Sequence, residues 1–163
     1  MINRDPLAIL VTGGTIDKVH DTLSESLILD GTTHIPDILG QGRARVSRIK
    51  TLMTIDSLDM DATDRAKILR AVQTAPENRI VITHGTGTME QTATALEGHI
   101  GKKTVVLTGA MRPWSLGQSD GNFNLGGAVI AARLLPSGVY GVMNGKVFKA
   151  SELRKDVQNG RFD

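Results

Sequence analysis

Cysteine is absent from the 163-residue sequence, which excludes disulfide bonds and thiolate metal ligands and permits a reducing compartment. Aromatic residues make up only 3% of the chain, so it has few of the stacking platforms that bind single-stranded nucleic acid. Neither sign of charge dominates: 19 basic and 17 acidic residues give a net charge of +2, too balanced for a nucleic-acid-binding face. The apolar run at residues 7–11 is too short for a signal peptide or a membrane span. We therefore expect a cytoplasmic protein without nucleic-acid or membrane partners.

Hydrophobic residues account for 40% of the sequence, which is enough for the core of one globular domain. Residues 7–12 form an almost wholly apolar run that Gly13 and Gly14 stop, and this pattern predicts a strand buried on both faces. Comparable runs follow at 79–83, 104–108 and 139–143, separated by helical patterns that begin after Asp61, at Met89 and near Asn122. This alternation predicts a three-layer α/β/α sandwich with a mainly parallel, Rossmann- or flavodoxin-like sheet.

Four other segments carry weaker patterns. Residues 43–50 alternate polar and apolar, which predicts a half-buried strand whose basic side chains face water. Residues 18–33 form a long polar loop, and such a loop beside a candidate site predicts a lid. Asn144-Gly145 predicts a hairpin turn with residues 146–148 pairing back. The tail at 151–163 is polar and charged, so we expect it to add little to the core.

Three of the predicted strands end in a threonine followed by a glycine, at Thr12-Gly13, at Thr108-Gly109 and, with one inserted residue, at Thr83-His84-Gly85. The carboxyl ends of parallel strands meet at one edge, so their loops should line one crevice at the topological switch point. The loops offer hydroxyl groups and backbone N–H groups, a combination that suits an anion or an oxyanion. The hydroxyls belong to Thr15, Ser57, Thr86 and Thr88, and the N–H groups to Gly13, Gly14, Gly85 and Gly87.

Several established site types do not fit the sequence. The four histidines, His20, His34, His84 and His99, lack ligand spacing, so we expect no metal. Neither the Walker A motif nor the serine elbow G-x-S-x-G occurs, and the third glycine of a dinucleotide fingerprint is missing after Gly87. We therefore expect no cofactor. What remains is threonine as nucleophile, with Lys18 or Lys155 as the base that activates it.

At this point the sequence resembles a known family. T-G-G-T-I-D at 12–17, T-H-G-T-x-T-M-E at 83–90 and L-T-G-A-M-R-P at 107–113 are similar to motifs of the bacterial-type L-asparaginases. D-S-L-D-M at 56–60 and F-N-L at 123–125 agree, so the resemblance covers nearly the whole chain in order. The resemblance implies a short-chain member: a single domain over residues 1–163, like the amino-terminal domain of the long enzymes, without a separate carboxy-terminal domain. It also implies a homodimer or homotetramer.

The resemblance further implies roles for individual residues. Thr15 matches the threonine that attacks the side-chain amide of L-asparagine and forms an acyl-enzyme, from which L-aspartate and ammonia are released. Thr86 and Lys155 match a second catalytic threonine and its paired lysine. Ser57 matches a residue that holds the substrate carboxylate. The other substrate-binding positions are Gly14, Asp56, Gly85, Gly87 and Ala110, and the lid positions are Ser24, Glu25 and Ser26.

Two positions depart from the family pattern. Gly87 stands where the family motif H-G-T-D-T has an aspartate, which binds the substrate α-ammonium. The lid has no tyrosine and carries Ser26 in its place, with Glu25 as a candidate replacement carboxylate. Two alternatives therefore remain open: an amidase for a related small amide, including one without an α-amino group, or a weakly active or non-catalytic protein that binds small carboxylates.

Structural explanations also exist for several of these residues. Thr15 and Thr86 could cap strand or helix ends. Ser57 could hydrogen-bond within its own loop, and Lys155 could be a solvated surface charge. Asp120 is expected to fix its loop. His84 is expected to be a buried histidine whose hydrogen bonds are satisfied.

Overall fold

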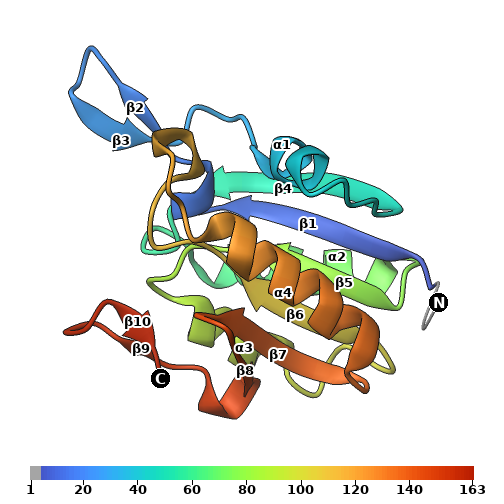
Figure 1. Cartoon of the computed structure of the whole chain (residues 1–163). Coiled ribbons are helices and arrows are strands. Elements are labelled where there is room, and N and C mark those ends of the chain that lie inside the picture. The colour runs from blue at the N-terminus through green and yellow to red at the C-terminus, as the bar shows by residue number, and fades with distance from the viewer. Residues whose placement is uncertain (1–4) are drawn as a thin grey trace.

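A six-stranded sheet runs through the centre of the computed structural model, which describes residues 5–163 (Figure 1). The strand order is β4-β1-β5-β6-β7-β8. The first five strands are parallel, and β8 pairs with β7 in the antiparallel direction. The strands span Leu7–Gly13 (β1), Arg48–Ile55 (β4), Arg79–Thr83 (β5), Thr104–Thr108 (β6), Gly138–Met143 (β7) and Lys146–Lys149 (β8).

Helices cover both faces of this sheet. α1 (Ile35–Gln41) and α4 (Gly121–Leu134) pack on one face, and α2 (Ala62–Thr74) and α3 (Met89–Leu96) pack on the other (Figure 1). Side chains of β1 point alternately to the two faces of the sheet. Those at odd positions pack with α1 and α4, and Leu10 packs with α2 and α3. The three-layer α/β/α prediction is therefore confirmed.

Smaller elements decorate the edges. β2 (Val19–Asp21) and β3 (Ser26–Ile28) form a hairpin that projects from the sheet, and β9 (Lys155–Asp156) pairs with β10 (Arg161–Phe162) (Figure 1). The expected hairpin between β7 and β8 is present, with Asn144 and Gly145 both at positive φ. Within residues 5–163 there are also three short 3-10 helices: η1 (Thr15–Asp17), η2 (Trp114–Leu116) and η3 (Ala150–Glu152).

Helix α2 shows how local sequence sets an element. Asp61 caps its first turn by accepting a hydrogen bond from the N–H of Asp64, whose own carboxylate accepts from the N–H of Asp61. Ile68 and Val72 are buried against the sheet. The helix ends two residues before Pro76, which disfavours helical angles at the residue before it.

The order in which the strands are added to the sheet reverses at β1. The chain passes from β1 to β4 on one side and then to β5 on the other. This order is the doubly wound arrangement in which ligands bind beyond the carboxyl ends of the central strands. The loops that follow β1, β4 and β5 meet at one pocket. The prediction of a shared crevice thus applies to the loops after β1 and β5, whereas the loop after β6, which was also expected there, contributes no lining residue.

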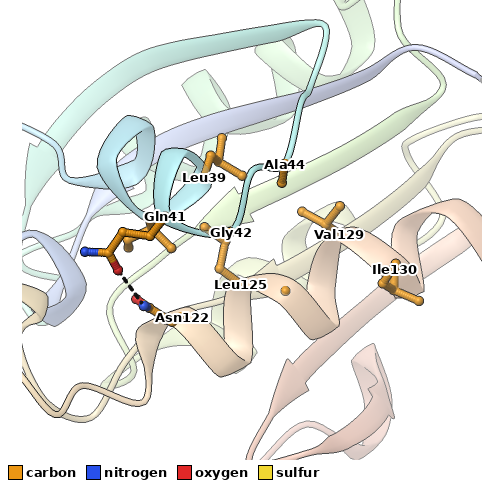
Figure 2. Close-up of a pocket in the computed structure, with 10 residues that line it drawn as sticks. Leu39, Gln41, Gly42, Ala44, Asn122, Leu125, Val129 and Ile130 are labelled. Carbon is orange, nitrogen blue, oxygen red and sulfur yellow. Dashed lines mark hydrogen bonds between the residues drawn. The ribbon is translucent and has the colours of Figure 1, made fainter.

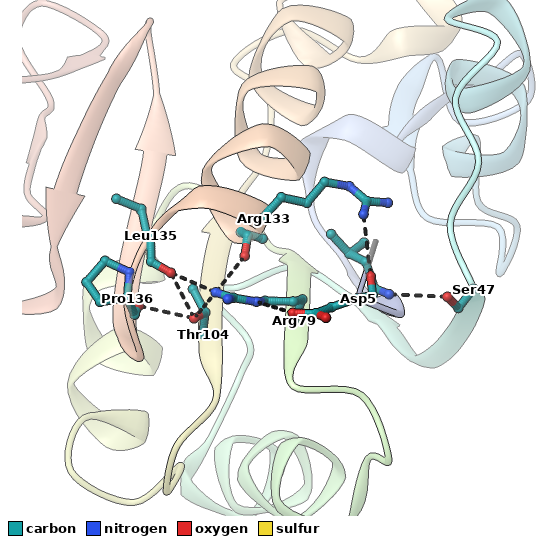
Figure 3. A network of polar contacts seen from close by, with 9 residues as sticks. Asp5, Ser47, Arg79, Thr104, Arg133, Leu135 and Pro136 are labelled. Carbon is teal, nitrogen blue, oxygen red and sulfur yellow. Dashed lines mark hydrogen bonds and ion pairs between the residues drawn. The ribbon is translucent and has the colours of Figure 1, made fainter. Parts of the chain in front are cut away.

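The opposite edge of the sheet is held by Arg79, at the start of β5 (Figure 3). Its guanidinium donates to the Oγ1 of Thr104 at 2.8 Å and to the carbonyl of Leu135 at 2.7 Å, and it lies 3.6 Å from the carboxylate of Asp5. These contacts join the amino ends of β5 and β6 to the end of α4. They stabilise the end of the sheet at which the parallel strands begin. The pocket lies at the other end, among the loops that follow the strands.

The strand predicted at 43–50 is wrong in its bounds, because β4 begins at Arg48 and continues to Ile55. The residues before it complete the end of α1: the N–H of Ala44 donates to Leu39 O, and Arg43 has φ of 49°. The basic side chains of residues 43–50 were expected to face water, but Arg48 has a protein partner. Arg48 makes a two-pronged ion pair with Glu77, with Nε–Oε1 at 2.9 Å and Nη2–Oε2 at 2.6 Å.

The prediction that the tail adds little to the core is also wrong. Leu153 and Phe162 are buried in the layer that contains α2 and α3, and the ring of Phe162 lies 6.4 Å from that of Phe148. Two apolar residues among many polar ones are a weak sequence signal. The short β9–β10 ladder and the N–H of Phe162, which donates to Asn144 Oδ1 at 2.8 Å, fix the tail against β7 and β8.

Phe162→Ala should therefore destabilise the protein by about 3–5 kcal/mol, the usual cost of truncating a buried aromatic side chain. Urea unfolding monitored by circular dichroism measures the change. Val157→Ala is the matched control in the same tail, because Val157 is 80% exposed and should change stability by no more than about 0.5 kcal/mol. Equal small effects for the two variants would show that the tail is not part of the core.

Candidate active site

A pocket of about 170 Å³ opens where the loops after β1, β4 and β5 meet. Three segments that are distant in the sequence contribute lining residues to this pocket, and the tail contributes one more. The lining of the pocket combines hydroxyl, amine and carboxylate groups with glycine backbone, a composition suited to polar chemistry on a small molecule. The lining residues are Thr15, Lys18, Asp56, Ser57, Leu58, Gly85, Thr86, Gly87 and Lys155.

Two glycines allow these loops to come close. A Cβ at Gly14 would collide with the backbone of Gly85, and Gly14 also has a φ of 87°. A Cβ at Gly85 would lie 2.5 Å from the Oγ of Ser57. The glycines of T-G-G-T and H-G-T therefore let the three loops pack backbone against backbone. This packing brings Thr15 and Thr86, which are 71 positions apart in the sequence, to the same pocket.

Thr86 is paired with the tail lysine. The Nζ of Lys155 donates to the Oγ1 of Thr86 at 2.8 Å, across 69 residues of sequence. Lys155 lies in β9, which the buried side chains of Leu153 and Phe162 hold in place on either side. Lys155 is thus one of the pocket-lining groups, in contact with a hydroxyl that is itself buried.

The second lysine of the pocket is engaged with a carboxylate. Lys18 Nζ lies 2.6 Å from Asp56 Oδ2, and the N–H of Leu58 donates to Asp56 Oδ1 at 3.0 Å. Partial burial acts to raise the pKa of Asp56, but these hydrogen bonds and the lysine charges outweigh it, so the pKa is held below its ordinary value. Asp56 is therefore an anion with partners on both oxygens. The Lys18 ammonium, held in this pair, is poorly placed to act as a base.

Ser57 joins two of the loops. Its Oγ accepts from the N–H of Thr88 at 3.3 Å, and its carbonyl accepts from the Thr88 hydroxyl at 2.7 Å. These bonds run to a different loop, so the Ser57 side chain connects the loops after β4 and β5 and does not close its own loop as expected. Ser57 also lines the pocket, so the structural and ligand-binding interpretations are compatible.

His84 sits beneath the pocket as a buried residue with both ring nitrogens engaged, as expected. Its Nδ1 lies 2.8 Å from the carbonyl of Gly85 and its Nε2 lies 2.7 Å from the Oγ1 of Thr92. Burial lowers the pKa of His84 from 6.5 to about 4, because the charged imidazolium would lose its hydration. The ring is neutral near pH 7 and supports the loop of Thr86.

This shift predicts an acid-sensitive fold. The unfolded chain binds a proton at His84 below pH 6.5 while the folded chain does not, so stability falls as the pH drops from 6.5 towards 4. The expected loss from this residue is roughly 3 kcal/mol in total. Thermal unfolding at pH 7.0, 5.5 and 4.5 measures the slope, which His84→Gln should flatten whatever its absolute stability. His99→Gln, at an exposed histidine, should keep the slope of the native protein; an unchanged slope in His84→Gln would contradict the assignment.

Other predicted positions lie outside the pocket lining. The N–H of Gly14 already donates to Ile55 O at 3.1 Å, and the side chain of Ala110 is buried in the core beside α4. Ser24, Glu25 and Ser26 lie on the exposed β2–β3 hairpin, so Glu25 does not bring a carboxylate to the pocket in this conformation. Asp120 accepts from the N–H groups of Met111 and Arg112, so the expectation that it fixes its loop is confirmed.

Leu58 is the pocket-lining residue that sequence reasoning missed. It is 73% exposed and follows directly after Ser57. The usable signal was its place between two polar residues of D-S-L-D, in a loop already assigned to the crevice.

Two larger hollows flank α4 and differ in character from this site. The one between α1 and α4 has a volume of about 470 Å³ and is lined mostly by aliphatic side chains and glycine, together with Gln41 and Asn122, which are hydrogen-bonded to each other (Figure 2). The other lies between α4 and β8, and Lys146 is the titratable residue in its lining. Neither hollow brings a hydroxyl and an ammonium group together.

Residues 5–163 contain neither a metal-binding cluster nor a membrane span. Within that range, no group of three or more histidine, cysteine, aspartate or glutamate side chains is arranged to hold a metal ion. No helix of the described chain is both long enough and apolar enough to cross a membrane.

Fold and pocket together define a doubly wound α/β protein with a hydroxyl–lysine site at its topological switch point. A sequence profile of the amino-terminal asparaginase domain matches residues 6–162, and the chain belongs to this asparaginase family.

Named relatives share this region. The chain is 35% identical over 159 residues to the probable periplasmic L-asparaginase of Haemophilus influenzae, covering 91% of this chain and 46% of the relative. It is 32% identical over 155 residues to a component of the glutamyl-tRNA(Gln) amidotransferase of Methanococcus vannielii, covering 89% and 35%. The thermostable L-asparaginase of Thermococcus kodakarensis superposes with a TM-score of 0.83 at 28% identity, covering 97% of this chain and 50% of that one. The chain thus spans about half the length of such relatives, or less.

Proposed function

We propose that this protein is an amidohydrolase that cleaves the side-chain amide of L-asparagine or a closely related small acid through a threonine nucleophile. The observation that carries the proposal is the hydrogen bond from Lys155 to Thr86 inside the pocket that Thr15 also lines. Helix or strand capping alone does not account for it, because a buried threonine hydroxyl meets a lysine from the far end of the chain. The names of the relatives agree, since several are L-asparaginases.

In the proposed reaction, the Oγ1 of Thr15 attacks the amide carbon and the C–N bond breaks. The hydroxyl proton of Thr15 passes to the leaving nitrogen, which departs as ammonia. A water molecule then attacks the resulting ester, and its proton is taken up by the Thr86–Lys155 pair. The bond from Thr15 to carbon breaks and the pair passes this proton to Oγ1, which releases a carboxylic acid and restores the hydroxyl.

The remaining groups position the substrate. The Lys18 ammonium and the Ser57 hydroxyl favour a substrate carboxylate at the β4 side of the pocket. Gly85, Thr86 and Gly87 line the same pocket, and we propose that backbone N–H groups of this segment hold the oxyanion that forms at the amide carbon. The proposed chemistry uses protein groups and water only.

Ammonia release from asparagine, glutamine and simple amides, measured with the purified protein, tests this function. Turnover of at least one carboxamide supports it. A thermal shift with asparagine or aspartate in the absence of any turnover would instead support a protein that binds small carboxylates without catalysis.

Assembly and location are proposals of the same kind. We propose a homodimer or homotetramer built from this single domain, which sedimentation of the purified protein tests. We propose a cytoplasmic location, because a cysteine-free chain suits a reducing compartment and one structural neighbour is a probable cytoplasmic L-asparaginase of Campylobacter jejuni. Cell fractionation tests the location.

A further inference from the structure

The amines that line the pocket outnumber its carboxylates. Lys18 contributes an ammonium group, Lys155 contributes a second amine nitrogen, and Asp56 contributes the single carboxylate found among the described lining residues. Both oxygens of that carboxylate are already engaged, one by Lys18 and one by the N–H of Leu58. Glu90 lines a neighbouring pocket on the other side of Lys155 and is not part of this lining. The pocket therefore offers a ligand positive charge and hydroxyl groups, and no uncommitted negative charge.

The wall at Gly87 is aliphatic. A Cβ built at Gly87 would lie 2.7 Å from Cδ2 and 3.1 Å from Cγ of Leu58, so the leucine side chain occupies the space beside the glycine. Leu58 also projects into solvent from its loop, with 73% of its surface exposed. The side of the pocket formed by residues 58 and 87 consequently presents methyl groups and backbone to a ligand.

These two features discriminate between ligands. An ammonium group placed in this pocket loses water and meets the like charge of Lys18, and the one carboxylate there, Asp56, already bonds Lys18 and the N–H of Leu58. A carboxylate gains a lysine partner, and an uncharged carbon fits the leucine wall. Discrimination of this kind depends on whether a charge is left unpaired, and so it is large compared with that between two uncharged groups.

We propose that the preferred substrates are ω-amides of small carboxylic acids that carry no free ammonium next to the carboxylate, such as the monoamide of a four-carbon dicarboxylic acid. This proposal rests on the amidohydrolase function proposed above. The reaction balances in the same way: the amide C–N bond breaks, water supplies the new oxygen, and the products are an ammonium ion and a dicarboxylate.

The test compares succinamate with L-asparagine, which differ by the α-ammonium group alone. The native protein is expected to show a kcat/KM for succinamate at least tenfold above that for asparagine, because one unpaired buried charge costs a factor of that order or more. A higher value for asparagine would overturn the substrate proposal and leave the amidohydrolase function standing. Ammonia release from neither compound, nor from glutamine or simple amides, would overturn the function itself and the substrate proposal with it.

A second experiment introduces a carboxylate into the pocket at position 87. Gly87 is not among the glycines with positive φ, and the nearest obstruction is the end of the exposed Leu58 side chain, so a larger residue requires that side chain to shift. Gly87→Asp should raise kcat/KM for asparagine roughly tenfold or more relative to succinamate. Gly87→Asn has the same shape without the charge and should not shift this ratio. Equal ratios in the two variants would overturn the charge argument, since shape alone would then set the preference.

Discussion

Thr15→Val should abolish ammonia release, with a fall in kcat of roughly 1,000-fold or more, because the proposed reaction passes through an ester on this hydroxyl. Valine keeps the branched shape of the side chain and removes the oxygen. Thr15 is half-buried in η1, and the side-chain hydrogen bonds of the loop are made by its neighbour Asp17, so the fold should persist. Steady-state ammonia assays and circular dichroism on the same preparation separate lost chemistry from lost structure.

Thr15→Ser is the matched control, because it retains the hydroxyl in nearly the same place and should keep a measurable fraction of activity. Mass spectrometry after rapid acid quench adds a direct readout: an acyl adduct should appear on the peptide that contains Thr15 and be missing in the valine variant. Activity in Thr15→Val comparable to the native protein would eliminate the proposed nucleophile, whatever the other residues do.

The second large effect is expected at Lys155. Lys155→Met should lower kcat by roughly 100- to 10,000-fold, the usual range when a positioned proton acceptor is removed. Methionine preserves most of the aliphatic length and removes the amine that bonds Thr86. The variant should still bind substrate, so KM should change much less than kcat. Stopped-flow and steady-state ammonia assays check both.

The pair also predicts non-additivity. Thr86→Val and Lys155→Met should each be severe, and the double variant should be little worse than either single one, because both remove the same hydrogen-bonded unit. Arg154→Met, one residue earlier and exposed, is the matched control and should leave kcat nearly unchanged. Strictly multiplicative effects would mean that Thr86 and Lys155 act independently.

The fold was predictable because its strands are short, apolar and stopped by glycine. The run at 7–12 and the helix after Asp61 needed only period and capping chemistry to be recognised. The edge strand β4 was harder, since half of an edge strand faces water and its pattern continues into the segment that closes α1. Phe162 could not be found, because a single aromatic residue in a charged tail has no periodicity to reveal its burial.

The site was predictable in its parts but not in its contacts. Sequence alone proposed that Thr15 and Thr86 share a crevice, and the structure places both in one pocket lining. Residue types alone left both Lys18 and Lys155 open as the base, and the resemblance favoured Lys155. The partner that each amine meets, Asp56 for one and Thr86 for the other, is seen only in the structure. The aliphatic wall was also hidden, since it requires knowing that Leu58 packs beside Gly87.

The placement of Lys155 on β9 determines when the pocket is completed during synthesis of the chain. During synthesis the five parallel strands and all four helices of the described chain emerge before Lys155 does. A nascent chain can thus assemble its sheet and both layers of helices while the pocket still lacks one of its amines. Completion of the pocket thus depends on a segment made after the strands and helices that build the sheet and its two covering layers.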